Sequence, residues 1–152
     1  MAMSEGEWNL VLKGWAKVES DPAGVGQAVL LRFFEDHPEA LPHFKKFEHL
    51  SKAELKSFAG VRTHGEAVVN LLTKMFSTRG KHASLLKPMA EEHCKTLKIP
   101  VKYFEMICEV IVKVMAESYP DFGPDGQAAT RKALKIVCKD IAGYYESCES
   151  TR

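Results

Sequence analysis

Apolar residues recur every three or four positions along almost the whole chain, the spacing of helices that bury one face. Alternation with a period of two, which marks a half-buried strand, is almost absent. There are no internal repeats, low-complexity stretches or long linkers. We therefore predict a single all-α domain over residues 1–152, built from seven or eight helices. Residues 1–3 and 150–152 are expected to be disordered or foreign to the natural protein.

Capping residues predict where the first helices begin. Ser4 with Glu7 forms a capping box, in which two unpaired backbone N–H groups are satisfied by side chains three residues apart. Ser51 with Glu54 forms a second capping box, which predicts one long helix from this point toward Thr78.

Prolines predict most of the other helix boundaries, because proline suits the first turn of a helix and the residue before it avoids helical backbone. Asp21-Pro22 predicts a helix start and His37-Pro38 the end of that helix. Residues 39–50 are expected to form an ordered corner. Three further helices are expected over residues 85–97, 100–119 and 124–145.

The composition narrows the possible functions. The chain is 45% hydrophobic and 27% charged, as in ordinary globular proteins, and its net charge is only +1. This charge is dispersed, so nothing supports binding to nucleic acid or to a membrane surface. No apolar run approaches the roughly 18 residues of a membrane span, and the polar start does not resemble a signal peptide. We expect a cytoplasmic monomer.

Four cysteines, at positions 94, 108, 138 and 148, contain no C-x-x-C pair, which argues against a structural zinc site. Cys108 and Cys138 fall on predicted apolar stripes, and we interpret them as small core residues. In an intracellular protein, free thiols are the default state.

Two histidines, His64 and His93, follow the helical period of the apolar face of their own predicted helices. Imidazole is the commonest metal-ligating side chain, so two of them facing an apolar interior suggest a bound metal cofactor. The plainer interpretation is a core histidine with an internal partner. An unpaired buried imidazole would cost roughly 1–3 kcal/mol, and either a ligand or such a partner would remove that cost.

Six segments of the chain form a recognisable series. They are SEGEWNLVLKGWAKVE, LLRFFEDHPEALPHFKKFEHL, THGEAVVNLL, LLKPMAEEH, LKIPVKYFE and RKALKIVCKDIAGYY. Each segment alone is a weak indication of a family. Together, in this order and at this spacing, the six segments are a specific signature that extends over nearly the whole chain. In them the chain resembles the vertebrate globins, most closely the myoglobin type. The resemblance implies a globin fold that encloses haem b.

The resemblance implies unequal roles for the two histidines. His93 would be the proximal iron ligand, and His64 the distal residue that donates a hydrogen bond to bound dioxygen. Ferrous haem with one imidazole keeps a sixth position open for dioxygen, carbon monoxide or nitric oxide. Dioxygen is the more polar of the first two when bound, so the hydrogen bond favours it over carbon monoxide.

Further residues match family positions that contact haem. They are Leu30, Phe44, Lys46, Val68, Met89, Leu97, Ile99, Phe104 and Ile107. Phe44 would wedge against the haem face, and Lys46 would pair with a haem propionate. Core packing and a solvated surface lysine are the plainer interpretations of these two residues.

Two positions depart from the family pattern. Glu92 stands where myoglobins commonly have a serine that accepts a hydrogen bond from the proximal imidazole. It either replaces that bond with an ionic one or points into solvent. Leu97 replaces a histidine near a propionate, which predicts faster haem loss. The chain is also one residue shorter than typical myoglobins between Leu50 and His64, and again near Tyr119-Pro120. Together with the four cysteines, these departures favour a non-mammalian myoglobin or a sister lineage such as the eye-expressed globin.

The resemblance leaves several functions open. The leading hypothesis is reversible dioxygen binding for storage or facilitated diffusion. The same haem could instead support nitric oxide dioxygenation, nitrite reduction or a weak peroxidase activity. A redox sensor with both histidines on the iron, and a helical interaction module without haem, are the remaining alternatives.

Overall fold

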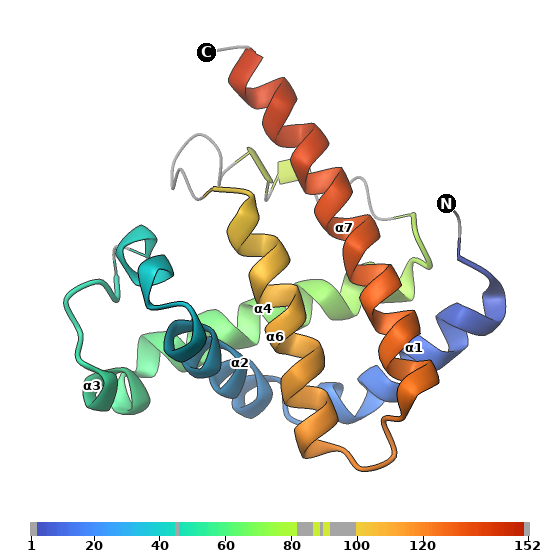
Figure 1. Cartoon of the computed structure of the whole chain (residues 1–152), viewed down its shortest axis with the longest axis horizontal. Helices are drawn as coiled ribbons and strands as arrows, with labels where there is room; N and C mark the ends of the chain where they lie inside the picture. Colours follow the sequence, from blue (N-terminus) through green and yellow to red (C-terminus); the bar gives the residue numbers. More distant parts are fainter. Residues whose placement is uncertain (1–2, 45, 82–86, 89, 92–99, 151–152) are drawn as a thin grey trace.

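The computed structural model describes residues 3–44, 46–81, 87–88, 90–91 and 100–150, with side chains as far as residue 146 (Figure 1). Within these ranges the regular structure is entirely helical, as predicted. The described helices are α1 (Glu5–Glu19), α2 (Pro22–Asp36), the 3-10 helix η1 (Pro38–His43), α3 (Lys52–Ser57), α4 (Ala59–Ser77), α6 (Lys102–Ser118) and α7 (Pro124–Ser150). Of the helix expected over 85–97, only residues 87–88 and 90–91 are described, and their backbone is helical.

The predicted helix starts are confirmed by their caps. Ser4 Oγ accepts a hydrogen bond from the Glu7 backbone N–H at 3.1 Å, and the Glu7 carboxylate accepts one from the Ser4 N–H at 2.9 Å. Ser51 and Glu54 repeat this exchange at the start of α3. The Asp21 side chain caps α2, with proline in the first turn.

The prediction of a single long helix from Ser51 toward Thr78 is wrong, because the helix is interrupted at Phe58. Phe58 has extended backbone, with φ −78° and ψ 116°, and α4 begins at the next residue. Its ring meets the buried Phe47 edge-on at 5.9 Å. Gly60 leaves room for this turn, since a Cβ there would lie 2.6 Å from the Phe58 ring. A capping box specifies where a helix starts, whereas this contact determines where it ends.

Two glycines bring α2 and α4 together at their crossing. Gly26 and Gly65 are both buried, and a Cβ atom on either would overlap the backbone of the other. Only glycine permits so close a backbone approach. Leu30 lies one helical turn after Gly26, and His64 is next to Gly65. Because the two helices cross at these glycines, both side chains reach the same part of the interior.

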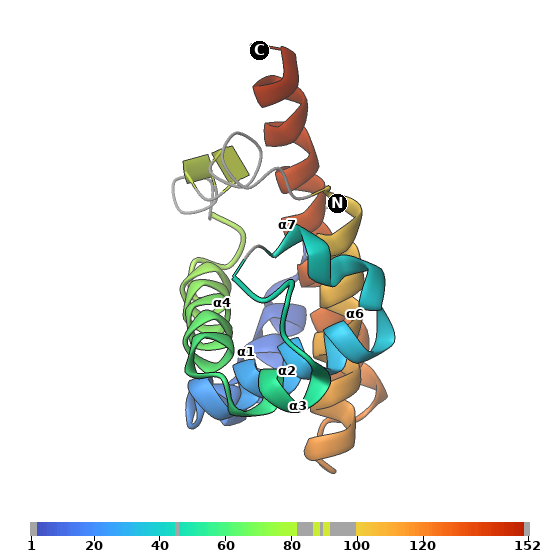
Figure 2. The ribbon, with the colours of Figure 1, turned by 90° about the vertical axis from the view of Figure 1, so that its left-hand side faces the viewer.

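The remaining helices complete a shell around that interior. In Figure 2, α4 lies on one side of the molecule and α6 and α7 lie on the other. A hydrogen bond from Trp15 Nε1 to Thr73 Oγ1, 2.8 Å long, joins α1 to α4. An ion pair between Arg32 and Glu117, 2.9 Å long, joins α2 to α6. Among the helices that the structure describes, none is long and apolar enough to cross a membrane.

Candidate functional site

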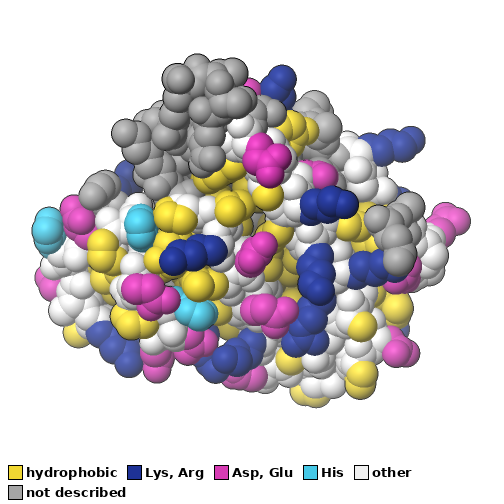
Figure 3. All heavy atoms as spheres, turned by 45° about the horizontal axis from the view of Figure 1, so that its top comes forward, with side chains coloured by type: hydrophobic (Ala, Val, Ile, Leu, Met, Phe, Trp, Pro, Cys, Tyr) yellow, Lys and Arg dark blue, Asp and Glu magenta, His cyan; other side chains and the backbone are white. Residues whose placement is uncertain are grey.

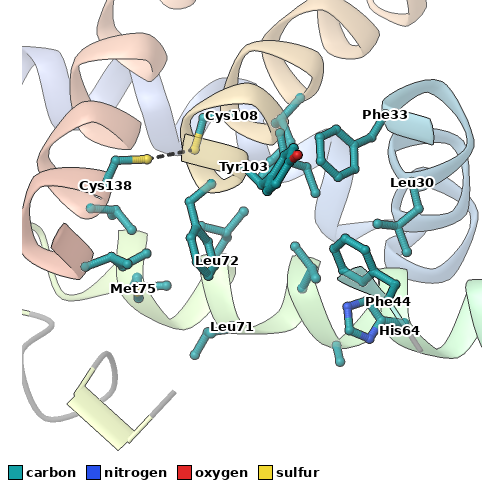
Figure 4. A pocket seen from close by; sticks show the side chains of 17 residues that line it. Leu30, Phe33, Phe44, His64, Leu71, Leu72, Met75, Tyr103, Cys108 and Cys138 are labelled. Carbon is teal, nitrogen blue, oxygen red and sulfur yellow. Dashed lines mark hydrogen bonds between the residues drawn. The ribbon is translucent and has the colours of Figure 1, made fainter. Parts of the chain in front are cut away.

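A cavity of about 210 Å³ lies between α2, α4, α6 and α7 (Figure 4). Its described lining is Leu30, Phe33, Phe44, His64, Ala67, Val68, Leu71, Leu72, Met75, Tyr103, Phe104, Ile107, Cys108, Ile111, Val137, Cys138 and Ile141. In this lining, the side-chain atoms other than carbon belong to His64, Tyr103, Met75 and two thiols. The described wall therefore suits a largely apolar guest.

His64 projects from α4 at one end of the cavity and is half-buried. Phe44 meets its ring edge-on at a centroid distance of 6.0 Å, and Phe47 meets it at 5.9 Å. Both ring pairs are close to perpendicular, with interplanar angles of 86° and 83°. Aromatic pairs of this kind favour one orientation of each ring, so the imidazole is held by its neighbours. Figure 4 shows it beside Phe44 at the cavity wall.

The structure brings six of the predicted site residues together. They are Leu30, Phe44, His64, Val68, Phe104 and Ile107, and all of them line the cavity. Lys46 is exposed and is not part of the lining. The other predictions, which concern Met89, Glu92, His93, Leu97 and Ile99, lie outside the described residues.

Several lining residues were not singled out from the sequence as site residues. Leu71, Leu72 and Met75 share the apolar face of α4 with His64, and their helical spacing from it was the available signal. Tyr103 carried no such signal, since it reaches the cavity from the first turn of α6. Its ring lies 6.4 Å from that of Phe33, which also lines the cavity.

One wall of the cavity comes from a part of the chain far from His64. Val137, Cys138 and Ile141 lie on α7 and face the side chains of α6. The sequence predicts the apolar stripe that holds Cys138 but not the interior surface that this stripe lines. Figure 4 shows Cys138 of α7 and Cys108 of α6 approaching each other at this wall.

The arrangement suits a guest with a largely apolar, aromatic surface. Aromatic and branched aliphatic side chains pack well on such a surface, and the His64 imidazole lies in the same wall. Apolar side chains also reach the surface. On the face shown in Figure 3 they gather into a patch among Lys, Arg, Asp and Glu side chains.

A comparison with known protein families agrees with this geometry. The family model described as Globin matches residues 27–141 of the chain. That range holds every described residue of the cavity lining, from Leu30 to Ile141. The match therefore spans the elements that build the candidate site.

Proposed function

This chain belongs to the globin family, and we propose that it is a haem protein that binds dioxygen reversibly, for storage or facilitated diffusion. Globins typically bind haem, and haem b is the cofactor that we assign to the cavity. The observation that carries the proposal is the imidazole of His64, held by two aromatic rings at an otherwise hydrocarbon part of the cavity wall. His93 is proposed as the proximal iron ligand on the resemblance alone.

Haem held through the His93 imidazole would supply a ferrous iron that can bind a diatomic gas. The residues of this chain would determine which gas is held there. His64 offers an imidazole N–H to a polar guest, and a hydrogen bond is stronger in the low dielectric of an apolar cavity than in water. Leu30 and Val68 line the same cavity and keep water out of it. Carbon monoxide and nitric oxide are the other gases expected to bind.

The remaining contacts are proposed from the lining and from the resemblance. Phe44, Phe104 and Ile107 would hold the macrocycle by packing, because all three line the cavity. Met89, Leu97 and Ile99 are proposed as further contacts. Lys46 is exposed, which suits a partner for a propionate at the surface.

We also propose a lineage and a setting for the protein. Glu92 and Leu97 favour a non-mammalian myoglobin or a sister lineage such as the eye-expressed globin. The low net charge of +1 supports a monomer without nucleic-acid or membrane partners, and we place it in the cytoplasm.

The visible absorption spectrum of the reduced, gas-free protein tests the proposal directly. We expect a Soret band and the broad band of five-coordinate ferrous haem. A sharp six-coordinate spectrum would contradict dioxygen storage and favour a redox sensor with both histidines on the iron. Absence of a Soret band after reconstitution with haem would eliminate the haem assignment.

The His93→Gly variant tests the ligand assignment. We expect it to lose haem, or to retain haem only when imidazole is added to fill the vacated position. The matched control is His49→Gly, because the His49 side chain is 91% exposed. The control should keep the wild-type spectrum. A normal five-coordinate spectrum in His93→Gly without imidazole would refute the assignment.

A further inference from the structure

Two thiols from neighbouring helices lie in direct contact. Cys108 on α6 and Cys138 on α7 place their Sγ atoms 3.3 Å apart, and neither forms a disulfide (Figure 4). Cys138 is buried and Cys108 is half-buried. From the sequence we interpret both cysteines as small core residues. That interpretation explains why the two side chains are buried or half-buried, but it does not explain why their Sγ atoms touch.

The same two thiols also line a second hollow, on the outer side of the α6–α7 pair. This groove has a volume of about 590 Å³. Its other lining residues are Glu105, Glu109, Arg131, Leu134, Lys135, Lys139 and Ala142. The thiol pair thus forms a wall shared by the inner cavity and this outer groove, and a small solute in the groove can reach it.

We propose that Cys108 and Cys138 form a reversible redox site, in which exchange with a small disulfide joins them into a disulfide that links α6 to α7. The sulfur atoms would move about 1.2 Å closer, from 3.3 Å to the usual S–S bond length near 2.05 Å. This is the scale of a side-chain adjustment rather than of a helix movement. The proposal does not depend on the haem assignment.

The environment of the pair favours Cys138 as the attacking thiol. The hydrogen bond between the two thiols lowers the pKa of Cys138 and raises the pKa of Cys108. Thiolate is the attacking form in disulfide exchange. The described lining of the groove has three cationic side chains against two carboxylates, Glu105 and Glu109, and Arg131 pairs with Glu109 at 3.3 Å. The remaining small excess of positive charge suits a small disulfide that carries carboxylates, such as oxidised glutathione.

The exchange then proceeds in two balanced steps. Cys138 thiolate, its proton already lost to water, attacks one sulfur of the small disulfide, and a small thiolate leaves. That thiolate takes the Cys108 proton. Cys108 sulfur next attacks the Cys138 sulfur of the mixed disulfide, and the second small thiolate leaves and is protonated from water. The two protein thiols have lost two electrons and two protons, and the small disulfide has become two small thiols.

Peptide mapping of the full chain tests the proposal. After incubation with oxidised glutathione and alkylation of free thiols, trypsin should release Cys108 in residues 103–113 and Cys138 in residues 136–139. We expect these two peptides to be joined, and to separate again after reduced glutathione is added. Cys94 and Cys148 fall in separate peptides, residues 82–95 and 140–152, which should carry alkylated thiols.

Thermal unfolding gives a second measurement. A disulfide that closes a loop of about 30 residues should raise the Tm of the oxidised protein by roughly 5–15 °C. Oxidised glutathione should not raise the Tm of Cys138→Ser or Cys108→Ser, because neither variant can form the cross-link, whereas Cys148→Ser should respond as the wild type does. Peptides joined in any other pairing, a stable glutathione adduct without a cross-link, or no reaction in the wild type would each overturn the proposal.

Discussion

At the scale of single residues, His64 is the side chain on which the proposed function most depends. It shares the lining of the cavity with hydrocarbon neighbours such as Leu30 and Val68, which do not offer a hydrogen bond. Phe44 and Phe47 hold its ring edge-on. An oriented donor among such hydrocarbon neighbours is expected to discriminate between guests by polarity rather than by size.

Replacement of His64 by leucine tests that discrimination. A hydrogen bond to a partly charged guest is worth about 1.5–3 kcal/mol, so dioxygen release should become roughly 10- to 100-fold faster in His64→Leu. Carbon monoxide release should change much less. Laser photolysis and stopped-flow rates for both gases measure the effect, with His49→Leu as the exposed control. Equal changes for the two gases would show that the imidazole acts by bulk alone.

At the scale of secondary structure, the crossing of α2 and α4 positions the site. The two helices touch through Gly26 and Gly65, where neither backbone leaves room for a Cβ. His64 and Leu30 reach the cavity from the two sides of this contact. The approach of these helices thus determines how far apart the two side chains lie.

The Gly65→Ala variant should force the two helices apart. Overpacking of this kind costs about 1–3 kcal/mol, although alanine by itself is the better helix former. We expect a lower Tm and a loss of apparent haem affinity. Gly143→Ala is the matched control, because a Cβ at that position of α7 meets nothing within 4 Å. An unchanged or raised Tm in Gly65→Ala would contradict the close contact.

At the scale of the whole molecule, polar contacts connect helices that are distant in the sequence. Lys132 Nζ on α7 lies 3.0 Å from Glu7 on α1, so the first and last helices are joined directly. The Ser4 backbone N–H, followed by the Lys132 ammonium, holds the pKa of Glu7 below its ordinary value of 4.5. A lowered pKa means that the folded protein favours the charged carboxylate.

This carboxylate predicts a pH dependence of stability. Because its pKa is lower in the folded chain, its contribution is fully present above pH 4.5 and is lost as the pH falls through the lower folded value. Glu7→Gln keeps a capping acceptor for Ser4 but removes the charge. We expect its Tm to be below that of the wild type at pH 7, with the difference shrinking below pH 4.5. In the Lys132→Gln background only part of the difference at pH 7 should disappear, because the Ser4 N–H contributes more than Lys132 to the lowered pKa of Glu7.

The all-α class, the capped helix starts and the cavity-facing side of α4 followed from the sequence alone. They depend on interactions within one helical turn: a capping box spans three residues, and an apolar stripe repeats every three or four. His64 could therefore be predicted as a cavity residue, because it follows the spacing of the apolar face of α4. The family match over residues 27–141 confirms the expected globin fold.

What only the tertiary structure decided involves residues far apart in the chain. The break at Phe58 depends on a contact with Phe47, and the place of Tyr103 at the cavity depends on how α6 approaches α2. The meeting of Cys108 and Cys138 likewise required α6 and α7 to pack side by side. Local spacing predicts which face of a helix is buried, but not which other face it meets, because that choice is made by the packing of all the helices together.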